Sequence, residues 1–143
     1  MVDYFTIVGI ILIIVVAVLL RKKHRKLTTD QKLQQIKDKV TMIDPRVERL
    51  NFYVDFEEAY ILYKKDIFMC LKNKAGDYYD DNFLTYIAIH EIAHALSPED
   101  TSDHPPSFEK EFDSLINKAI ALKIYDPKIP FPTEYCNKEL KYY

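Results

Sequence analysis

Residues 86 to 96 read Tyr-Ile-Ala-Ile-His-Glu-Ile-Ala-His-Ala-Leu, placing two histidines and a glutamate in an otherwise mostly apolar run. His90 and His94 lie four residues apart, and Glu91 directly follows the first histidine. On a helix, residues with this spacing project from the same face one turn apart, so their imidazoles can bind one metal ion. Glu91 would lie about 100 degrees further round the helix, where it can reach the water that a catalytic zinc activates.

A metal site competes here with a simpler interpretation, an amphipathic helix with two surface histidines and a solvated glutamate. The positions between and around the three polar residues are apolar or small, so most of the helix is expected to be buried: Ile87, Ala88, Ile89, Ile92, Ala93, Ala95 and Leu96. Burying ionisable groups is costly unless they are paired or bound to metal. The pattern therefore favours a metal site. Zinc suits it, because two imidazoles, a third protein ligand and a water make a catalytic tetrahedron.

The sequence offers two kinds of third ligand. His104 follows His94 by ten residues, in a polar loop, and Pro105 and Pro106 come directly after it. A short loop can return this histidine to the motif without a special helix crossing, so His104 is the preferred ligand. The alternative interpretation is that His104 binds no metal and only precedes the next helix in a polar loop. The alternative ligand is an acidic residue on that helix: Glu109, Glu111 or Asp113.

Length and charge limit the possible architectures and partners. With 143 residues and a formal net charge of −2, the chain has room for one compact domain and shows no charge signature of nucleic-acid binding. Its two cysteines, Cys70 and Cys136, are far apart and fit no zinc-ribbon spacing. One disulfide between them is possible, but two buried reduced thiols are the preferred prediction if the domain faces the cytosol.

The N-terminal segment predicts a membrane anchor. A short tail at residues 1–4 precedes an uncharged apolar run at residues 5–20, and basic residues fill positions 21–26. A cleaved signal peptide carries its positive charges before the apolar run instead of after it. We therefore expect a transmembrane anchor at residues 5–20, a basic juxtamembrane linker at residues 21–30 and a single-pass membrane protein. The positive-inside rule would then place the C-terminal domain in the cytosol.

The remaining pattern predicts an α+β domain over residues 31–143. Helical spacing of apolar residues predicts a helix that ends near residue 42. Aromatic and branched residues predict an antiparallel hairpin of Tyr60–Tyr63 and Ile67–Leu71, with Asn51–Val54 as a possible third strand. The motif helix and a C-terminal helix beginning near Pro105 follow, and the proline-rich tail from Asp126 is expected to run extended over the surface.

The chain resembles the WLM/SprT-like zinc metallopeptidases in the order of its motifs. His-Glu-Ile-Ala-His is followed by a loop, then by His104, and four residues later by Phe108. The chain also resembles a small branch of such proteins from large DNA viruses. The tyrosine-rich segment at residues 78–86 and the pair Tyr135-Cys136 carry that second resemblance. Together the matching features extend from about residue 44 to residue 136.

This resemblance implies a zincin-like metallopeptidase domain with one zinc ion on His90, His94 and His104. It also implies that Glu91 is the general base in hydrolysis of a protein or peptide substrate. An extended substrate is expected to pair with an exposed strand beside the motif helix, for which Ile67–Leu71 is the predicted strand. With eleven tyrosines in the chain, the oxyanion donor is not identified from the sequence.

The better-known cellular members of the family that the chain resembles act on proteins crosslinked to DNA and carry DNA- or partner-binding tails. This chain begins with the predicted anchor and ends soon after the core, so that substrate is not transferred and no direct nucleic-acid binding is expected. A host or virion membrane is expected if the protein is viral. Two alternatives remain open: a catalytically inactive, zinc-binding structural or adaptor protein at the membrane, and a zinc hydrolase that cleaves a non-peptide bond.

Overall fold

The computed structural model describes the backbone of residues 4–27 and 30–140 and the side chains of residues 6–19 and 30–140. Contacts divide the chain into two compact units, Met1–Asp30 and Gln31–Tyr143. Positions 1–3 of the predicted N-terminal tail lie outside the described residues.

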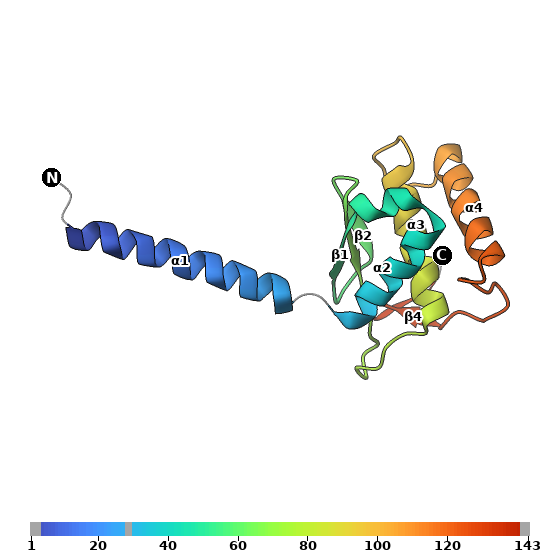
Figure 1. Ribbon diagram of the computed structural model, residues 1–143. Coiled ribbons are helices and arrows are strands. Elements are labelled where there is room, and N and C mark those ends of the chain that lie inside the picture. Colours follow the sequence, from blue (N-terminus) through green and yellow to red (C-terminus); the bar gives the residue numbers. More distant parts are fainter. Residues whose placement is uncertain (1–3, 28–29, 141–143) are drawn as a thin grey trace. The chain divides into compact units, whose positions relative to one another are not determined.

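The first unit contains the helix α1 (Tyr4–Leu27; Figure 1). Its described side chains are mainly apolar and exposed, as at Leu12 and Ile13. Within the described part of the chain, no helix combines the length and the apolar character that crossing a membrane requires. This finding overturns the predicted transmembrane anchor at residues 5–20 and the predicted single-pass localisation with a cytosolic domain.

The second unit holds a three-stranded sheet of β1 (Asn51–Val54), β2 (Tyr60–Leu62) and β3 (Asp66–Met69). The order is β1-β3-β2, with β1 parallel and β2 antiparallel to β3. The predicted hairpin of β2 and β3 is therefore confirmed. The sheet as a whole is mixed rather than antiparallel, because β1 runs parallel to β3 whereas β2 runs antiparallel to it. The predicted fold class is thus corrected to an α+β fold with a short mixed sheet.

The described residues of this unit also form three α-helices: α2 (Gln31–Ile43), α3 (Asp81–Leu96) and α4 (Pro106–Ala121), with a 3-10 turn, η1 (Pro45–Arg49), after α2. Helices α2 and α3 pack against the sheet, and α4 packs against α3 (Figure 1). Helix α2 buries one apolar face, consisting of Leu33, Ile36, Val40 and Ile43. Helix α3 is apolar nearly all round, so nearly all of it from Phe83 to Ala95 is buried between the other helices and the sheet. The motif helix is therefore the centre of the domain rather than a surface element.

Helix α3 has defined ends. Asp80 is its N-cap, and the Asp80 carboxylate accepts hydrogen bonds from the backbone N–H groups of Asn82 and Phe83. Ser97 closes the other end, where its N–H donates to the carbonyl of Ala93. Each cap pairs backbone groups that a buried helix end would otherwise leave unsatisfied. The register of the motif on this helix is therefore fixed from both sides.

The C-terminal tail forms a small hairpin of β4 (Glu134–Tyr135) and β5 (Lys138–Glu139), where the sequence predicted extended chain. The two turn residues between them, Cys136 and Asn137, both have positive φ, as a type I′ turn requires. Cys136 forms a disulfide with Cys70, so the preferred prediction of two reduced thiols is wrong. Folding brings the two Cα atoms within 5.6 Å of each other, a proximity that their separation of 66 residues does not reveal.

Candidate metal centre

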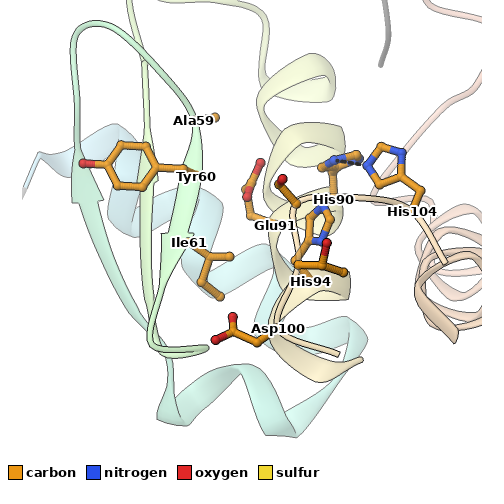
Figure 2. A pocket seen from close by; sticks show the side chains of 10 residues that line it. Ala59, Tyr60, Ile61, His90, Glu91, His94, Asp100 and His104 are labelled. Carbon is orange, nitrogen blue, oxygen red and sulfur yellow. Dashed lines mark hydrogen bonds between the residues drawn. The ribbon is translucent and has the colours of Figure 1, made fainter. Parts of the chain in front are cut away.

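Three histidines meet at the surface of α3 (Figure 2). His90 and His94 project from one face of the helix and are only 7% and 8% exposed. The loop after α3 turns back and brings His104 against them from the solvent side. The ring centroid of His90 lies 5.0 Å from that of His94 and 4.8 Å from that of His104. The centroids of His94 and His104 lie 5.2 Å apart. The three rings therefore form a nearly equilateral group.

The nitrogen positions match a metal site. The Nε2 atoms of His90 and His104 face each other 3.2 Å apart. Zinc–nitrogen bonds of about 2.0–2.1 Å at a tetrahedral angle place two ligand atoms roughly 3.3 Å apart. One ligand nitrogen from each of the three histidines lies within 4.8 Å of the other two. This group could hold a metal ion, and its donor set fits zinc.

Phe108, at the first turn of α4, supports the rings from behind. Its ring is 4% exposed and stacks on His104 with centroids 4.4 Å apart. The same ring lies 4.2 Å from the ring of His94 and 5.1 Å from that of His90. The four-residue spacing between His104 and Phe108 thus places one aromatic ring against all three candidate ligands, which restricts their orientations.

Burial keeps the two helix histidines neutral. Desolvation, followed by the neighbouring His94 and His104, lowers the pKa of His90 from 6.5 to about 3. Desolvation is also the largest cause of the lowered pKa of His94, and the charge of His104 contributes to it. A neutral imidazole is the form that binds a metal ion. At neutral pH, His90 and His94 are therefore in the form that can act as metal ligands.

Glu91 lies beside the histidines and faces the same cleft (Figure 2). It is 4% exposed, and desolvation raises the pKa of its carboxyl group from 4.5 to about 8. Without a cation nearby, this group would be mostly protonated at neutral pH. A cation held by the three imidazoles would favour the carboxylate form, because opposite charge lowers a carboxyl pKa. The ionisation of Glu91 is therefore expected to depend on metal occupancy.

The cleft in front of the histidines has a volume of about 470 Å³. One wall is the segment Ala59–Ile61, mostly strand β2, and the other is the loop Asp100–Ser102. The predicted substrate strand, Ile67–Leu71, is in the wrong position for this role. Its strand β3 is the central strand of the sheet, with Ile67 and Met69 fully buried. The open edge of the sheet beside the cleft belongs to β2.

The acidic alternatives for a third ligand lie elsewhere. Glu111 accepts a hydrogen bond from the Arg46 guanidinium, and Glu109 and Asp113 are exposed on α4. Among the described residues, the candidate metal-binding group contains histidines alone. Sequence reasoning thus identified the three side chains that fold together. It missed the loop wall of the cleft, because only the return path of the chain from α3 to His104 places that loop opposite β2.

Comparison with known proteins shows distant homology to proteins of large DNA viruses. The chain is 40% identical over 82 residues to "uncharacterized protein 136R" of Invertebrate iridescent virus 6, a match covering 55% of this chain and 45% of that protein. It is 36% identical over 85 residues to "uncharacterized protein 042R" of Invertebrate iridescent virus 3, covering 59% and 52% respectively. A protein of Acanthamoeba polyphaga mimivirus, R325, is 32% identical over 114 residues, covering 73% and 56%.

The chain therefore spans about half the length of the curated relatives that it matches. No family model matches the chain, and no solved structure matches it. The expected relationship to proteins of large DNA viruses is confirmed. Membership of the WLM/SprT-like metallopeptidases stays a prediction.

Proposed function

We propose that this domain is a zinc-dependent metallopeptidase, with His90, His94 and His104 as the ligands and Glu91 as the general base. One observation carries the proposal: three histidine rings converge beside a buried glutamate in an open cleft. Three protein ligands with an accessible fourth position are characteristic of catalytic zinc, whereas structural zinc sites are usually closed by four protein ligands. The arrangement therefore favours hydrolysis over a purely structural role.

Zinc bound at this site would lower the pKa of a bound water to about 7 and polarise the carbonyl under attack. Glu91 takes the proton of the attacking water and delivers it to the leaving amine. Its buried position holds the carboxylate next to the ligands, and the cleft in front of it leaves room for the reacting group. Phe108 keeps the imidazoles in place from the opposite side.

The open edge of β2 is suited to hold the substrate. An edge strand exposes unpaired N–H and C=O groups, to which an extended peptide can add as a further strand. Tyr60 lines the cleft, but its ring stacks on Phe68 with centroids 4.7 Å apart, and Figure 2 shows it directed away from the histidines. Tyr60 is therefore not a candidate for stabilising the oxyanion in this arrangement.

Two other functions use the same ligands: a zinc-binding structural or adaptor protein without turnover, and a hydrolase acting on a non-peptide bond. A structural site has no need of a buried carboxyl group beside its ligands, because the burial has an energetic cost. Glu91 therefore counts against the first alternative. The open edge of β2 favours a peptide over a substrate without a backbone that can pair with a strand.

Metal analysis of the full chain and a peptide-library cleavage assay test the proposal together. The purified wild type should contain one zinc per chain and cleave peptides. Glu91→Gln should keep the zinc and lose turnover, and His104→Ala should lose most of the zinc. Glu109→Gln, which changes the same kind of side chain on the exposed surface of α4, should leave both properties unchanged.

The outcomes separate the alternatives. Proteolysis retained by Glu91→Gln would remove Glu91 from the mechanism. Unchanged metal content in His104→Ala would transfer the third ligand to another residue. Zinc binding without cleavage of any peptide would favour the structural role or a non-peptide substrate.

A further inference from the structure

Asp100 gives the cleft a charge that the proposed chemistry does not use. The residues that line the cleft include two with a carboxyl group, Glu91 and Asp100. Figure 2 shows the Asp100 side chain pointing across the cleft toward β2, below the side chain of Ile61. Asp100 is exposed, so a molecule bound in the cleft can reach it without displacing other parts of the domain.

The carboxylate of Asp100 has no direct partner within the described part of the chain. Among the described residues, its carboxylate forms no ion pair and accepts no hydrogen bond. The adjacent Glu99 is different, because it accepts a hydrogen bond from the Ser107 hydroxyl. Lys64 donates to the backbone carbonyls of His94 and Ser97 instead of to Asp100. The negative potential at this wall of the cleft is therefore available to a ligand.

Asp100 is also distinct from the metal-binding group. The set of possible ligand atoms within 4.8 Å of one another contains the three histidines and does not include Asp100. At the same time, only two residues separate Asp100 from Ser97, the C-cap of α3. Ser97 in turn donates its hydroxyl to the carbonyl of His94. A short, anchored connection thus holds the carboxylate close to the ligands but outside their coordination sphere.

We propose that Asp100 selects peptides with a lysine or arginine close to the bond that is cut, a proposal that rests on the proposed peptidase function. A peptide strand paired with β2 lies between that strand and the loop Asp100–Ser102. Side chains of a strand alternate in direction, so one next to the reacting carbonyl faces the loop wall. A cationic side chain there pairs with Asp100, and an acidic side chain is repelled by it.

The test compares peptides that differ only in having Lys, Gln or Glu at each of the three positions on either side of the cleavage site. Cleavage is measured with the zinc-loaded full chain, and binding is measured by fluorescence anisotropy with zinc-loaded Glu91→Gln, which does not need turnover. The enzyme variants are Asp100→Asn, Asp100→Lys and a control, Asp113→Asn, which removes the same charge from the exposed surface of α4. Zinc content is measured for each variant.

The wild type should prefer Lys over Gln at one position by about fivefold, the upper range for a solvent-exposed ion pair. Asp100→Asn should abolish that preference, and Asp100→Lys should change the preference to Glu. Asp113→Asn should behave as the wild type. All variants should keep their zinc.

Four results would overturn the inference. They are an equal response to Lys and Gln peptides, a preference that persists in Asp100→Asn, a loss of zinc in Asp100→Asn, and no peptide binding at all. A Lys preference in binding that depends on Asp100, found together with no cleavage by the wild type, would support the inference and contradict the proposed reaction. Cleavage without any charge preference would support the proposed reaction and contradict the inference about Asp100.

Discussion

The Lys64 ammonium donates a hydrogen bond to the backbone carbonyl of His94, with Nζ and O 3.2 Å apart. Lys64 lies in the turn between β2 and β3, and it also donates to the carbonyl of Ser97. A cation at this place pairs with the last carbonyls of α3 and opposes the negative end of the helix dipole. The same contact fixes the end of the motif helix to the hairpin whose outer strand forms the wall of the cleft.

Replacing this cation should weaken the domain. Lys64→Met keeps most of the aliphatic length but removes the charged hydrogen bonds, so we expect the free energy of unfolding to fall by about 1–2 kcal/mol. Urea denaturation measures this change, and Lys65→Met is the control because Lys65 is exposed and belongs to the same turn. Equal stability of the two variants would show that the carbonyl contacts contribute nothing.

In the metal-free protein, stability should decrease as the pH rises from about 6.5 to 8. The folded-state pKa of Glu91 is raised to about 8, so between pH 4.5 and 8 this group keeps a proton in the folded chain that it loses in the unfolded chain. The lowered pKa of His90 acts in the opposite direction, but only between about pH 3 and 6.5. The two effects oppose each other up to pH 6.5, and above it Glu91 alone destabilises the fold by about 2 kcal/mol.

The measurement is urea denaturation with a chelator at pH 6.5 and at pH 8. Glu91→Gln stays neutral at both values, so its stability should be nearly the same at the two pH values. A wild-type decrease that persists undiminished in this variant would assign the pH dependence to other groups. Addition of zinc should reduce the decrease in the wild type, because a bound cation favours the ionised carboxylate.

Tyr135 should be essential to the packing around the disulfide. Its buried hydroxyl accepts a hydrogen bond from the N–H of Cys70 and donates one to the C=O of the same residue, at 3.1 and 3.0 Å. Tyr135→Phe leaves both backbone groups buried without this partner, so stability should fall by about 1–3 kcal/mol. Tyr63→Phe is a matched control, since Tyr63 is 87% exposed. Similar melting temperatures for the two variants would contradict this role.

The disulfide itself should contribute more. By the chain-entropy argument, a crosslink between residues 66 apart stabilises the fold by about 4 kcal/mol. The double variant Cys70→Ser and Cys136→Ser should therefore unfold at a much lower urea concentration than the oxidised wild type. Wild type treated with reductant should match the double variant. An oxidised wild type no more stable than the double variant would show that the crosslink does not form in the folded protein.

Phe108 should affect metal affinity more than its contribution to packing alone suggests. Phe108→Leu removes the ring that contacts all three histidines, so we expect zinc to bind about tenfold more weakly, the effect typical of groups that orient metal ligands. Competition with a coloured chelator measures the affinity. Leu115→Val is the control, because Leu115 is buried on the same helix and has no ring contact with the histidines. Equal zinc affinity of the two variants would contradict the orienting role.

Local patterns predicted those parts of the domain whose contacts are close in sequence. The spacing of His90 and His94 determined their common face, and the hairpin of β2 and β3 followed from two strand-like runs with a short turn. Relationships between distant segments were missed or, for the disulfide, considered but not preferred, because no local pattern records them. The parallel pairing of β1 with β3, the meeting of Cys70 with Cys136, and the position of Asp100 opposite Ile61 all depend on how the whole chain closes.

The strand order β1-β3-β2 has a dynamic consequence. Strand β3 is held on both sides, whereas β2 pairs with the sheet along one edge only. Opening of β2 breaks the fewest contacts, so its amide hydrogens should exchange with solvent faster than those of β3 or of the buried helix α3. The cleft can therefore widen by movement of one wall while the histidines stay in register. A bulky substrate would then enter by breaking a few backbone hydrogen bonds of β2, without disrupting the packing of the core.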